Sequence, residues 1–529
     1  MYNSIVDIFS AVPKYNILKE RINMSVVLEE KWSCLKSGTD IRGCAVEGVE
    51  GEEVNLTLDI CETITKAFVH WLADKTNTSP DTLTVSVGRD SRISGPAIAG
   101  VVIRALSGCG VKVLDCGLAS TPSMFMTTVD LKCSGAVMIT ASHHPFNRNG
   151  LKFFTPEGGL ESSDITKLLE ISQEISGNGN DQPNTLKGEI VLTDYMEQYS
   201  ERLRNMIKEG VNAEDYDHPL KGFKIAVDAG NGAGGFYAKK VLAPLGADTS
   251  GSRYLAPDGM FPNHVPNPEN ADAMKSICEA VKESGSDLGV IFDTDVDRGG
   301  AVDAFGNEIN RNRLVAVAAA IALENCEGGT IVTDSITSDG LKEFIEKTLH
   351  GRHHRFKRGY KNVINEAIRL NNEGIDCPLA IETSGHAAMR ENYFLDDGAY
   401  LCTKIIIKAA LLRKEGKTLE DLTRNLKEAL EEREVRYKIT EHDFRTYGES
   451  VIAKLNEYAL TKEGWTLADD SREGVRVSLD KEHGDGWFLL RLSVHDPIMP
   501  LNIESNEKGG CKKIFDQVSE FIALCDKLV

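Results

Sequence analysis

Short apolar runs rich in β-branched residues alternate with amphipathic stretches along most of this chain. Strands are predicted at 84–87, 111–114 and 136–139, with a helix at 96–107 between the first two. The rhythm returns downstream, with strands at 224–228, 288–292, 330–333 and 379–381 and helices near 235–245 and at 338–349. Strands and helices that alternate in this way form parallel or mixed sheets covered by helices, so an α/β fold is expected.

The chain is too long for one hydrophobic core, because 529 residues correspond to three or four domains of ordinary size. A charged connection at 209–220 and the pair Gly328 and Gly329 mark two boundaries. After Arg433 the pattern changes, and charged helices flank two predicted strands at 474–479 and 486–493. The predicted units are an extension at 1–30, α/β domains at 31–215, 216–325 and 326–432, and a C-terminal α+β domain at 433–529.

The acidic composition narrows the classes of partner. The net charge is −20, which argues against nucleic acid and anionic membranes as partners, since both require basic surface. An anionic small substrate remains compatible if basic groups gather in one cleft. The alanine-rich apolar run at 314–323 is about half the length of a membrane span and is predicted to be a core helix.

The twelve cysteines are scattered from Cys34 to Cys525 without a CxxC pair, which fits free thiols in a reducing compartment. We therefore expect a cytoplasmic protein. A plastid or another organelle is the alternative if residues 1–30 derive from a targeting segment, although their acidic residues are unlike a transit peptide.

Ser142 lies in a small polar loop directly after the apolar run 136–139, and two histidines follow it. Lys152 stands on the next apolar segment. A hydroxyl between a strand end and such groups suits a nucleophile or a phosphate carrier. Taken alone, the tripeptide SHH (142–144) is more often a polar turn, so the choice between a turn and a catalytic loop depends on the other loops.

A second loop, FDTDVDRGG at 292–300, places Asp293, Asp295 and Asp297 at alternate positions after a strand. Three carboxylates this close repel one another unless a cation joins them, and hard cations such as Mg²⁺ take such ligands. An EF-hand fits poorly, since Arg298 stands where that loop needs glycine. A solvated acidic turn is the alternative.

Two weaker loops follow. Glu382, Ser384 and His386 in IETSGH (381–386) offer donors and acceptors for sugar hydroxyls. Arg491 and Ser493 alternate in LRLSVHDP (490–497) and can face one anion from one side of a strand. Each of these loops alone is more typical of an ordinary polar loop or surface strand.

Two further segments are ambiguous. The turn GNGAGG (230–235) follows a strand but does not match a dinucleotide fingerprint in register, so tight backbone packing is the favoured interpretation. The basic island RHHRFKRGYK (352–361) is expected to be a solvated loop, with phosphate contacts as the alternative.

In this order the loops resemble the α-D-phosphohexomutase superfamily, which includes phosphoglucomutases and phosphomannomutases. TASHHP (140–145) resembles its phosphoserine loop, DTDVDR (293–298) its metal loop and ETSGH (382–386) its sugar-binding loop. Supporting matches are GTDIRG (38–43), VGRDSR (87–92), PDGMFP (257–262) and PNP (266–268). The resemblance implies three related α/β domains with mixed sheets and a fourth, C-terminal domain, arranged around a central cleft.

The resemblance also implies roles for individual residues. Ser142 would carry the phosphoryl group and complete, with Asp293, Asp295 and Asp297, the site of one Mg²⁺ per chain. The other catalytic residues would be Arg42, His143, Lys152 and Arg298. The substrate-binding residues would be Gly359, Lys361, Glu382, Ser384, His386, Arg491, Ser493 and His495.

The implied reaction interconverts hexose 1-phosphates and hexose 6-phosphates of glucose or mannose through a hexose 1,6-bisphosphate. Phosphosugars would be the substrates of a monomer or homodimer. The sequence departs from the family in the phosphate loop, where Val494 and His495 replace a glycine and a threonine, and at Gly359-Tyr-Lys361. The alternatives are a phosphoglucosamine mutase and a catalytically weak member that binds sugar phosphates as a regulator.

Overall fold

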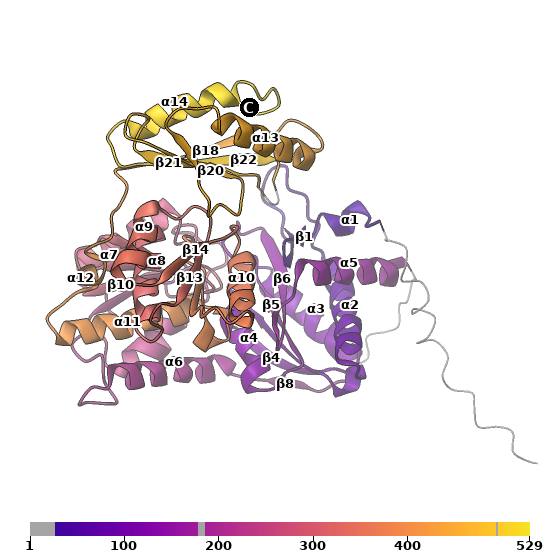
Figure 1. Ribbon diagram of the computed structural model, residues 1–529. Coiled ribbons are helices and arrows are strands. Elements are labelled where there is room, and N and C mark those ends of the chain that lie inside the picture. Colours follow the sequence, from indigo (N-terminus) through magenta and orange to yellow (C-terminus); the bar gives the residue numbers. More distant parts are fainter. Residues whose placement is uncertain (1–26, 178–185, 494–495) are drawn as a thin grey trace, which may run out of the picture.

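The computed structural model describes residues 27–177, 186–493 and 496–529, and four sheets organise them (Figure 1). Most of the predicted extension at 1–30 lies outside these residues. Three α/β units form the lower body in Figure 1, and the C-terminal sheet with its two helices lies across the top. The three α/β/α domains and the additional C-terminal domain agree with the predicted fold class, while the individual boundaries at 215, 325 and 432 stay predictions.

The first sheet is mixed, with eight strands of which seven run in the order β1-β2-β6-β5-β3-β4-β8. The pairs β3/β4, β3/β5 and β4/β8 are parallel, whereas β6 is antiparallel to β5 and β2. Its strands are β1 Lys36–Ser37, β2 Asp40–Cys44, β3 Thr84–Arg89, β4 Lys112–Leu118, β5 Gly135–Ile139, β6 Arg148–Thr155, β7 Gly158–Gly159 and β8 Ile190–Leu192.

Helices cover both faces of this sheet. The helices are α1 Glu30–Ser33, α2 Leu58–Thr76, α3 Gly95–Gly108, α4 Thr121–Asp130, α5 Ser162–Gly177 and α6 Tyr195–Val211. The apolar side chains of α2, α3 and α5 form one core with the strands. Those of α4 and α6 belong to a second, larger core that continues into the next two units. The first three units therefore share buried apolar surface.

The second unit has a four-stranded sheet in the order β12-β11-β10-β9. Strands β9 and β10 are parallel, and β11 is antiparallel to β10. Its elements are β9 Ile225–Asp228, a π-helical turn η2 Tyr237–Leu242, a 3-10 turn η3 Ala243–Leu245, α7 Ala271–Ser284, β10 Leu288–Phe292, β11 Gly299–Asp303 and β12 Glu308–Ile309.

The third unit repeats this plan in a five-stranded sheet of order β14-β13-β15-β16-β17. Strand β13 is parallel to β14 and β15, and β16 is antiparallel to β15. Its elements are α8 Arg311–Leu323, β13 Thr330–Thr333, α9 Asp339–Glu343, η4 Phe344–Thr348, β14 Arg352–Arg355, α10 Tyr360–Asn372, β15 Leu379–Ile381, β16 Ala387–Met389, β17 Leu395–Asp396, α11 Gly398–Lys414 and α12 Leu419–Thr423.

The three sheets share one feature that places the functional loops. Strands β5, β10 and β15 each pair in parallel on one side and antiparallel, with the next strand, on the other. The serine, aspartate and sugar-type loops each follow the carboxyl end of one of these strands. Loops at the carboxyl ends of parallel strands form the usual binding edge of an α/β sheet. The units are therefore structural repeats, which sequence similarity did not reveal.

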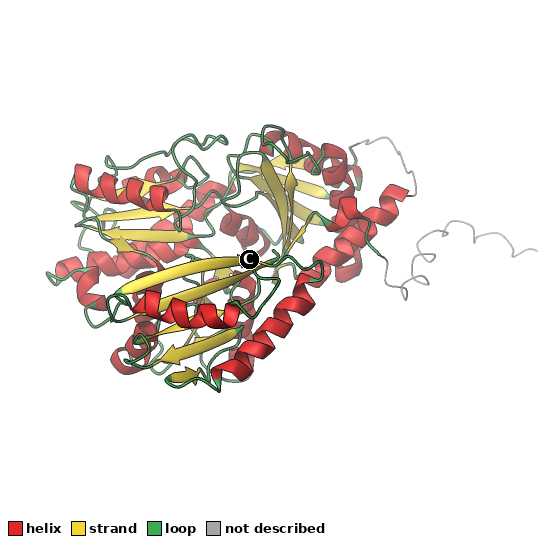
Figure 2. Ribbon diagram, turned by 90° about the horizontal axis from the view of Figure 1, so that it is seen from above, coloured by secondary structure: helices red, strands yellow, loops and turns green. Residues whose placement is uncertain are grey.

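The C-terminal unit is an antiparallel five-stranded sheet, β18-β22-β21-β20-β19, with two helices. Its elements are β18 Glu431–Lys438, α13 Phe444–Ala459, β19 Trp465–Leu467, β20 Val475–Leu479, β21 Gly486–Leu490, β22 Ile498–Ser505 and α14 Gly510–Ile522. Its apolar core is separate from the other cores. Seen from above in Figure 2, this unit overlies the space between the other sheets.

The structure corrects two local predictions. Strand β21 ends at Leu490 and not at 493, although the N–H groups of Arg491 and Ser493 still donate to Pro500 and Ile498. The basic island is not a solvated loop, because residues 352–355 form β14 and the side chain of Arg355 is buried. The charge of Arg355 is compensated by Asp339 and Asp470, which the sequence pattern does not bring near it.

The glycine-rich turn and the apolar helix match their predictions. A Cβ atom on Gly232 would lie 2.6 Å from the Thr294 carbonyl oxygen, so this turn packs against the aspartate loop through backbone alone. The alanine-rich run lies in α8 and is buried. Among the helices of the described residues, none has the length and apolar character that a membrane span needs.

Candidate active site

Ser142 stands three residues beyond the end of β5 in a strained turn. Its φ is +50°, a region that a residue with a side chain rarely adopts. Its N–H donates to Oγ1 of Thr140 at 2.9 Å, which fixes the turn. Although the residue is only 1% exposed, its hydroxyl points at the second unit and not into its own core.

The turn is held from behind by Arg92. Its guanidinium donates to the carbonyl oxygens of His144, Pro145 and Arg148 at 2.6–2.8 Å and also to that of Ser142. The buried carboxylate of Asp90 balances this charge at 3.3 Å and accepts from Thr140 Oγ1 at 2.7 Å. Burial raises the pKa of Asp90 to about 6. One buried cation thus shapes the whole serine loop.

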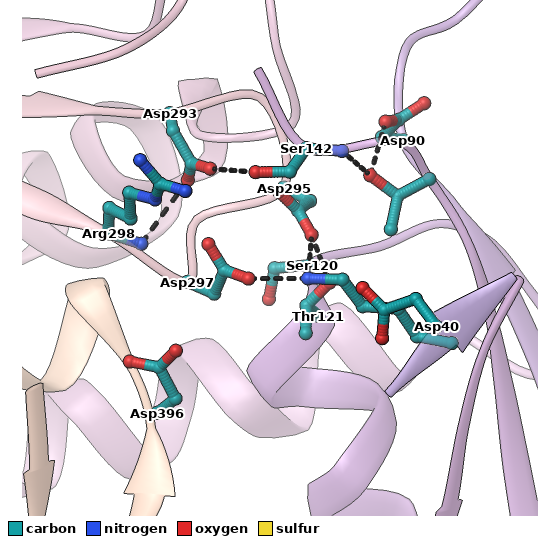
Figure 3. A network of polar contacts seen from close by, with 12 residues as sticks. Asp40, Asp90, Ser120, Thr121, Ser142, Asp293, Asp295, Asp297, Arg298 and Asp396 are labelled. Atoms are coloured by element: carbon teal, nitrogen blue, oxygen red, sulfur yellow. Dashed lines mark hydrogen bonds and ion pairs between the residues drawn. The ribbon is translucent and has the colours of Figure 1, made fainter. Parts of the chain in front are cut away.

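The three predicted aspartates converge beside Ser142 (Figure 3). Ser142 Oγ donates to Asp293 Oδ2 at 3.0 Å, across the boundary between the first two sheets. One carboxylate oxygen from each of Asp293, Asp295 and Asp297 lies within 4.8 Å of the others, and all three residues are buried. Thr121 Oγ1 also donates to Asp295. The loop and the serine therefore form one centre.

The electrostatics of this cluster fit a divalent cation. Burial, reinforced by the other two carboxylates, raises the pKa of Asp293 well above its usual range. Lys152 Nζ lies 3.0 Å from Asp295 Oδ2 and 2.5 Å from Asp297 Oδ2. Burial opposes ionisation of Asp297, but Lys152 holds its pKa below the usual range. Within the described part of the chain, Oδ1 of Asp295 and Oδ1 of Asp297 are buried without a hydrogen-bond partner, which suits oxygen ligands for a hard metal ion.

The other predicted catalytic residues surround the same centre. His143 Nδ1 lies 3.3 Å from Ser142 Oγ. Burial, followed by the charge of Arg298, lowers the pKa of His143 to about 2, so this imidazole is neutral at pH 7. The N–H of Arg298 donates to Asp293 Oδ1 at 3.2 Å, and Arg42 is held by Asp40 at 2.7 Å.

The sugar-type loop lies on the third sheet. Glu382 Oε1 accepts the N–H of Gly359 at 2.6 Å, and burial raises the pKa of Glu382 to about 7. The hydroxyl of Ser384 is buried and has no hydrogen-bond partner among the residues that the structure describes. His386 bonds to Asp396 through Nδ1 and stacks on Tyr360 at 5.1 Å. These groups offer donors and acceptors in one place.

Lys361 is not brought to this loop. Its Nζ donates to the Gly159 carbonyl at 2.8 Å and pairs with Glu161 at 2.8 Å, both in the first unit. It borders a cavity of about 260 Å³ between the first and third units, whose walls also include Lys152 and Asp297. Lys361 therefore joins the two units behind the aspartate cluster.

The phosphate-type loop is partly described. Arg491 Nη1 lies 4.0 Å from Glu473 Oε1, beyond hydrogen-bonding distance. Its Nε is buried and finds no hydrogen-bond partner in residues 27–177, 186–493 and 496–529. Ser493 Oγ accepts the N–H of Asp496 at 3.3 Å. His495 lies outside the described residues.

A cleft joins the serine side to the C-terminal unit. A cavity of about 560 Å³ has His143 at its wall together with Arg358 and Thr383 of the third unit. Its remaining walls include Trp487 and Asn502 of the C-terminal sheet. The lining carries both arginine and glutamate side chains, and its polarity and size suit a small, highly hydroxylated ligand.

Sequence reasoning assigned no role to several residues that shape the site. Asp90 and Arg92 belong to segment 87–92, which served only as a supporting match to the family. Glu269 directly follows another supporting match, at 266–268. Glu269 Oε2 lies 3.5 Å from Arg298 Nη1 and Oε1 lies 3.2 Å from Arg358 Nη2. A charged residue beside a proline-rich turn is too common to be singled out from sequence.

Comparison with known proteins identifies the family. Models described as phosphoglucomutase/phosphomannomutase, alpha/beta/alpha domains I, II and III, match residues 38–178, 197–306 and 310–429. A phosphomannomutase/phosphoglucomutase of Pseudomonas syringae pv. tomato is 30% identical over 431 residues, which cover 81% of this chain and 85% of that protein. A phosphoglucomutase of Neisseria meningitidis serogroup A is 28% identical, with 90% of this chain and 95% of that protein covered.

Solved structures agree in fold. A phosphoglucomutase/phosphomannomutase family protein from Burkholderia thailandensis has a TM-score of 0.75 at 24% identity, with 94% of this chain and 98% of that chain covered. A phosphoglucomutase from Paramecium, parafusin, has a TM-score of 0.65 at 17% identity, with 88% and 91% covered. The chain belongs to the phosphoglucomutase/phosphomannomutase family of the α-D-phosphohexomutase superfamily.

Proposed function

We propose that this protein is a phosphohexomutase that interconverts hexose 1-phosphates and hexose 6-phosphates of glucose, mannose or both. The hydrogen bond between Ser142 and Asp293 carries the proposal, because it joins a nucleophilic hydroxyl to a carboxylate cluster suited to a metal. The names of the relatives favour glucose and mannose phosphates. They do not favour a phosphoglucosamine mutase or a regulator that only binds.

Asp293, Asp295 and Asp297 would hold one Mg²⁺, with an oxygen of phosphorylated Ser142 completing the site. The metal would supply neutralisation of charge on the transferred phosphoryl group. Around it, Arg298 and Lys152 place positive charge near Ser142. The neutral imidazole of His143, with Nδ1 3.3 Å from the serine oxygen, is placed to orient that oxygen through a hydrogen bond.

The reaction consists of two phosphoryl transfers. Phosphoserine gives its phosphoryl group to a hydroxyl of the bound hexose phosphate, which yields a hexose 1,6-bisphosphate. This intermediate turns end for end in the cleft, and Ser142 takes the other phosphoryl group. Glu382, Ser384 and His386 would hold ring hydroxyls, and Arg491 and Ser493 the phosphate that is not reacting.

The test is a coupled assay of 1-phosphate to 6-phosphate conversion with Mg²⁺ and catalytic hexose 1,6-bisphosphate. Ser142→Ala removes the acceptor oxygen and is expected to reduce turnover to background, whereas Ser162→Ala, at an exposed serine, leaves it unchanged. Absence of turnover by the unmodified protein on glucose and mannose phosphates, despite tight binding, would contradict the proposal. The ratio of kcat/KM for the two 1-phosphates then gives the preferred sugar.

The proposed Mg²⁺ site is tested with Asp295→Asn, and the control is Asp272→Asn on the exposed face of α7. Loss of one ligand is expected to weaken Mg²⁺ binding at least roughly 10-fold, since even groups outside the ligand shell have effects of that size. Calorimetric titration with Mg²⁺ measures this without turnover. An unchanged affinity in Asp295→Asn would rule out the metal assignment.

A further inference from the structure

Of the basic island at 352–361, Arg358 is the one residue that lines the cavity of about 560 Å³ between His143 and the C-terminal sheet. It lies between β14 and α10, and its neighbour Lys357 is exposed. Other basic residues of the island have separate structural roles, since Arg355 is buried against Asp339 and Lys361 pairs with Glu161. The proposed mechanism leaves Arg358 without a role.

The backbone around Arg358 joins the two substrate loops. The N–H of Arg358 donates to Glu473 Oε2 at 3.2 Å, and Glu473 is the carboxylate that faces Arg491. The N–H of the next residue, Gly359, donates to Glu382 of the sugar-type loop. Arg358 is thus fixed between the residues proposed to bind ring hydroxyls and those proposed to bind phosphate.

The side chain of Arg358 completes a line of alternating charges across the cleft. Its Nη2 lies 3.2 Å from Glu269 Oε1, and the other oxygen of Glu269 lies 3.5 Å from Arg298. On the other side, burial and then the charge of Arg358 lower the pKa of Arg491, against the opposing effect of Glu473. Arg358 through its backbone N–H and Arg491 through its guanidinium both lie beside Glu473, so the two like charges are neighbours. Among the described residues, no carboxylate is hydrogen-bonded to the Arg491 guanidinium.

Two neighbouring guanidinium groups of this kind favour an anion between them. Each carries planar N–H groups that match two oxygens of a phosphate. Glu269 pairs with Arg358 in the unliganded site. A phosphate carries more negative charge than this carboxylate and can replace it as the partner of Arg358. The phosphate loop, with Val494 and His495 in place of a glycine and a threonine, lacks the hydroxyl donor of the family pattern.

We infer that Arg358 binds the non-reacting phosphate of the substrate together with Arg491, and that Glu269 holds its guanidinium when the cleft is empty. This inference rests on the proposed function, because it adds a residue to the same substrate site. In both orientations of the bisphosphate, Arg358 would hold the phosphate far from Ser142. It supplies a donor that the altered phosphate loop has lost.

The experiment compares Arg358→Gln and Arg358→Lys with Lys357→Gln, which removes the exposed neighbouring charge. Arg358→Gln is expected to raise KM for glucose 1-phosphate roughly 10- to 100-fold, the effect of losing a charge-assisted hydrogen-bonding group. Because this phosphate is bound in the ground state and the transition state alike, kcat changes much less. Arg358→Lys restores part of the affinity, and Lys357→Gln matches the unmodified protein.

A binding measurement makes the result independent of turnover. Calorimetry on the Ser142→Ala background gives Kd for glucose 1-phosphate with and without Arg358→Gln, and thermal unfolding confirms that each variant is folded. An unchanged Kd overturns the inference, and so does a loss of activity that is confined to kcat and that Arg358→Lys does not rescue. In either case, normal turnover of the unmodified protein leaves the proposed function intact. If the unmodified protein binds hexose phosphates without turnover, the proposed function fails and Kd alone decides the role of Arg358.

Discussion

Arg92 shows how much of the site depends on a residue that takes no part in the chemistry. It is fully buried, and its guanidinium holds four backbone carbonyls of the serine loop. The φ of +50° at Ser142 costs free energy, which such a set of bonds can offset. The nucleophile is therefore positioned by a neighbouring loop and not by its own strand.

Replacing Arg92 by lysine should loosen this turn. A lysine cannot reach the same four carbonyls, and loss of about two or three charge-assisted hydrogen bonds predicts destabilisation by roughly 3–5 kcal/mol. Urea unfolding measures the free energy of unfolding, and kcat is expected to fall more than KM rises. The same change at the exposed Arg104 of α3 is the control, and equal stability of the two variants would exclude the proposed role.

At the scale of the elements, the strand-turn-strand units built on β5, β10 and β15 each deliver one functional loop to the cleft. The C-terminal sheet contributes differently, through side chains of its antiparallel strands. Glu504 on β22 is buried in that sheet and accepts from Trp487 Nε1 at 2.8 Å. Burial, followed by the charge of Glu432, raises the pKa of Glu504 from 4.5 to about 7.

This pKa predicts a pH dependence of stability. Because the folded protein holds the proton of Glu504 more tightly than the unfolded chain, the contribution is fully present below about pH 4.5 and is lost as the pH rises through about 7. At about 1.4 kcal/mol per pKa unit, the loss approaches ~3 kcal/mol. Glu504→Gln removes this titrating group, so its free energy of unfolding should fall less between pH 5 and pH 8 than that of the control, Glu449→Gln at an exposed position. Urea unfolding at both pH values measures this, and an equal change in the free energy of unfolding for the two variants would contradict the prediction.

For the whole molecule, the division of the cores matters most. The first three units share apolar packing, whereas the C-terminal unit has a core of its own. It meets the third unit through ion pairs of the buried arginines Arg355 and Arg476. The half-exposed Asp339 accepts from Arg355 of its own unit at 2.7 Å and, across the contact, from Arg476 at 2.9 Å. The wall of the cleft that carries Arg491 is therefore attached by polar interactions.

Asp339→Asn should weaken this attachment. Removal of one anion leaves two buried arginines less well compensated, but solvent screens the half-exposed carboxylate, so the predicted loss at the contact is roughly 1–2 kcal/mol. Limited proteolysis is expected to cleave faster in the connection at 424–430, and calorimetry to show the C-terminal unit unfolding earlier. The exposed Glu346→Gln on the same segment is the control, and identical cleavage rates would refute the prediction.

The sequence alone determined the α/β class, the order of the functional loops and the residues that form the serine–aspartate centre. These follow from local features, namely hydrophobic periodicity and polar residues placed directly after strands. Only the tertiary structure revealed Arg92 behind Ser142, placed Lys361 away from the sugar-type loop and put Glu269 between Arg298 and Arg358. Such contacts join segments from about 30 to more than 200 residues apart, and no local pattern encodes which buried charges will meet when the sheets pack together.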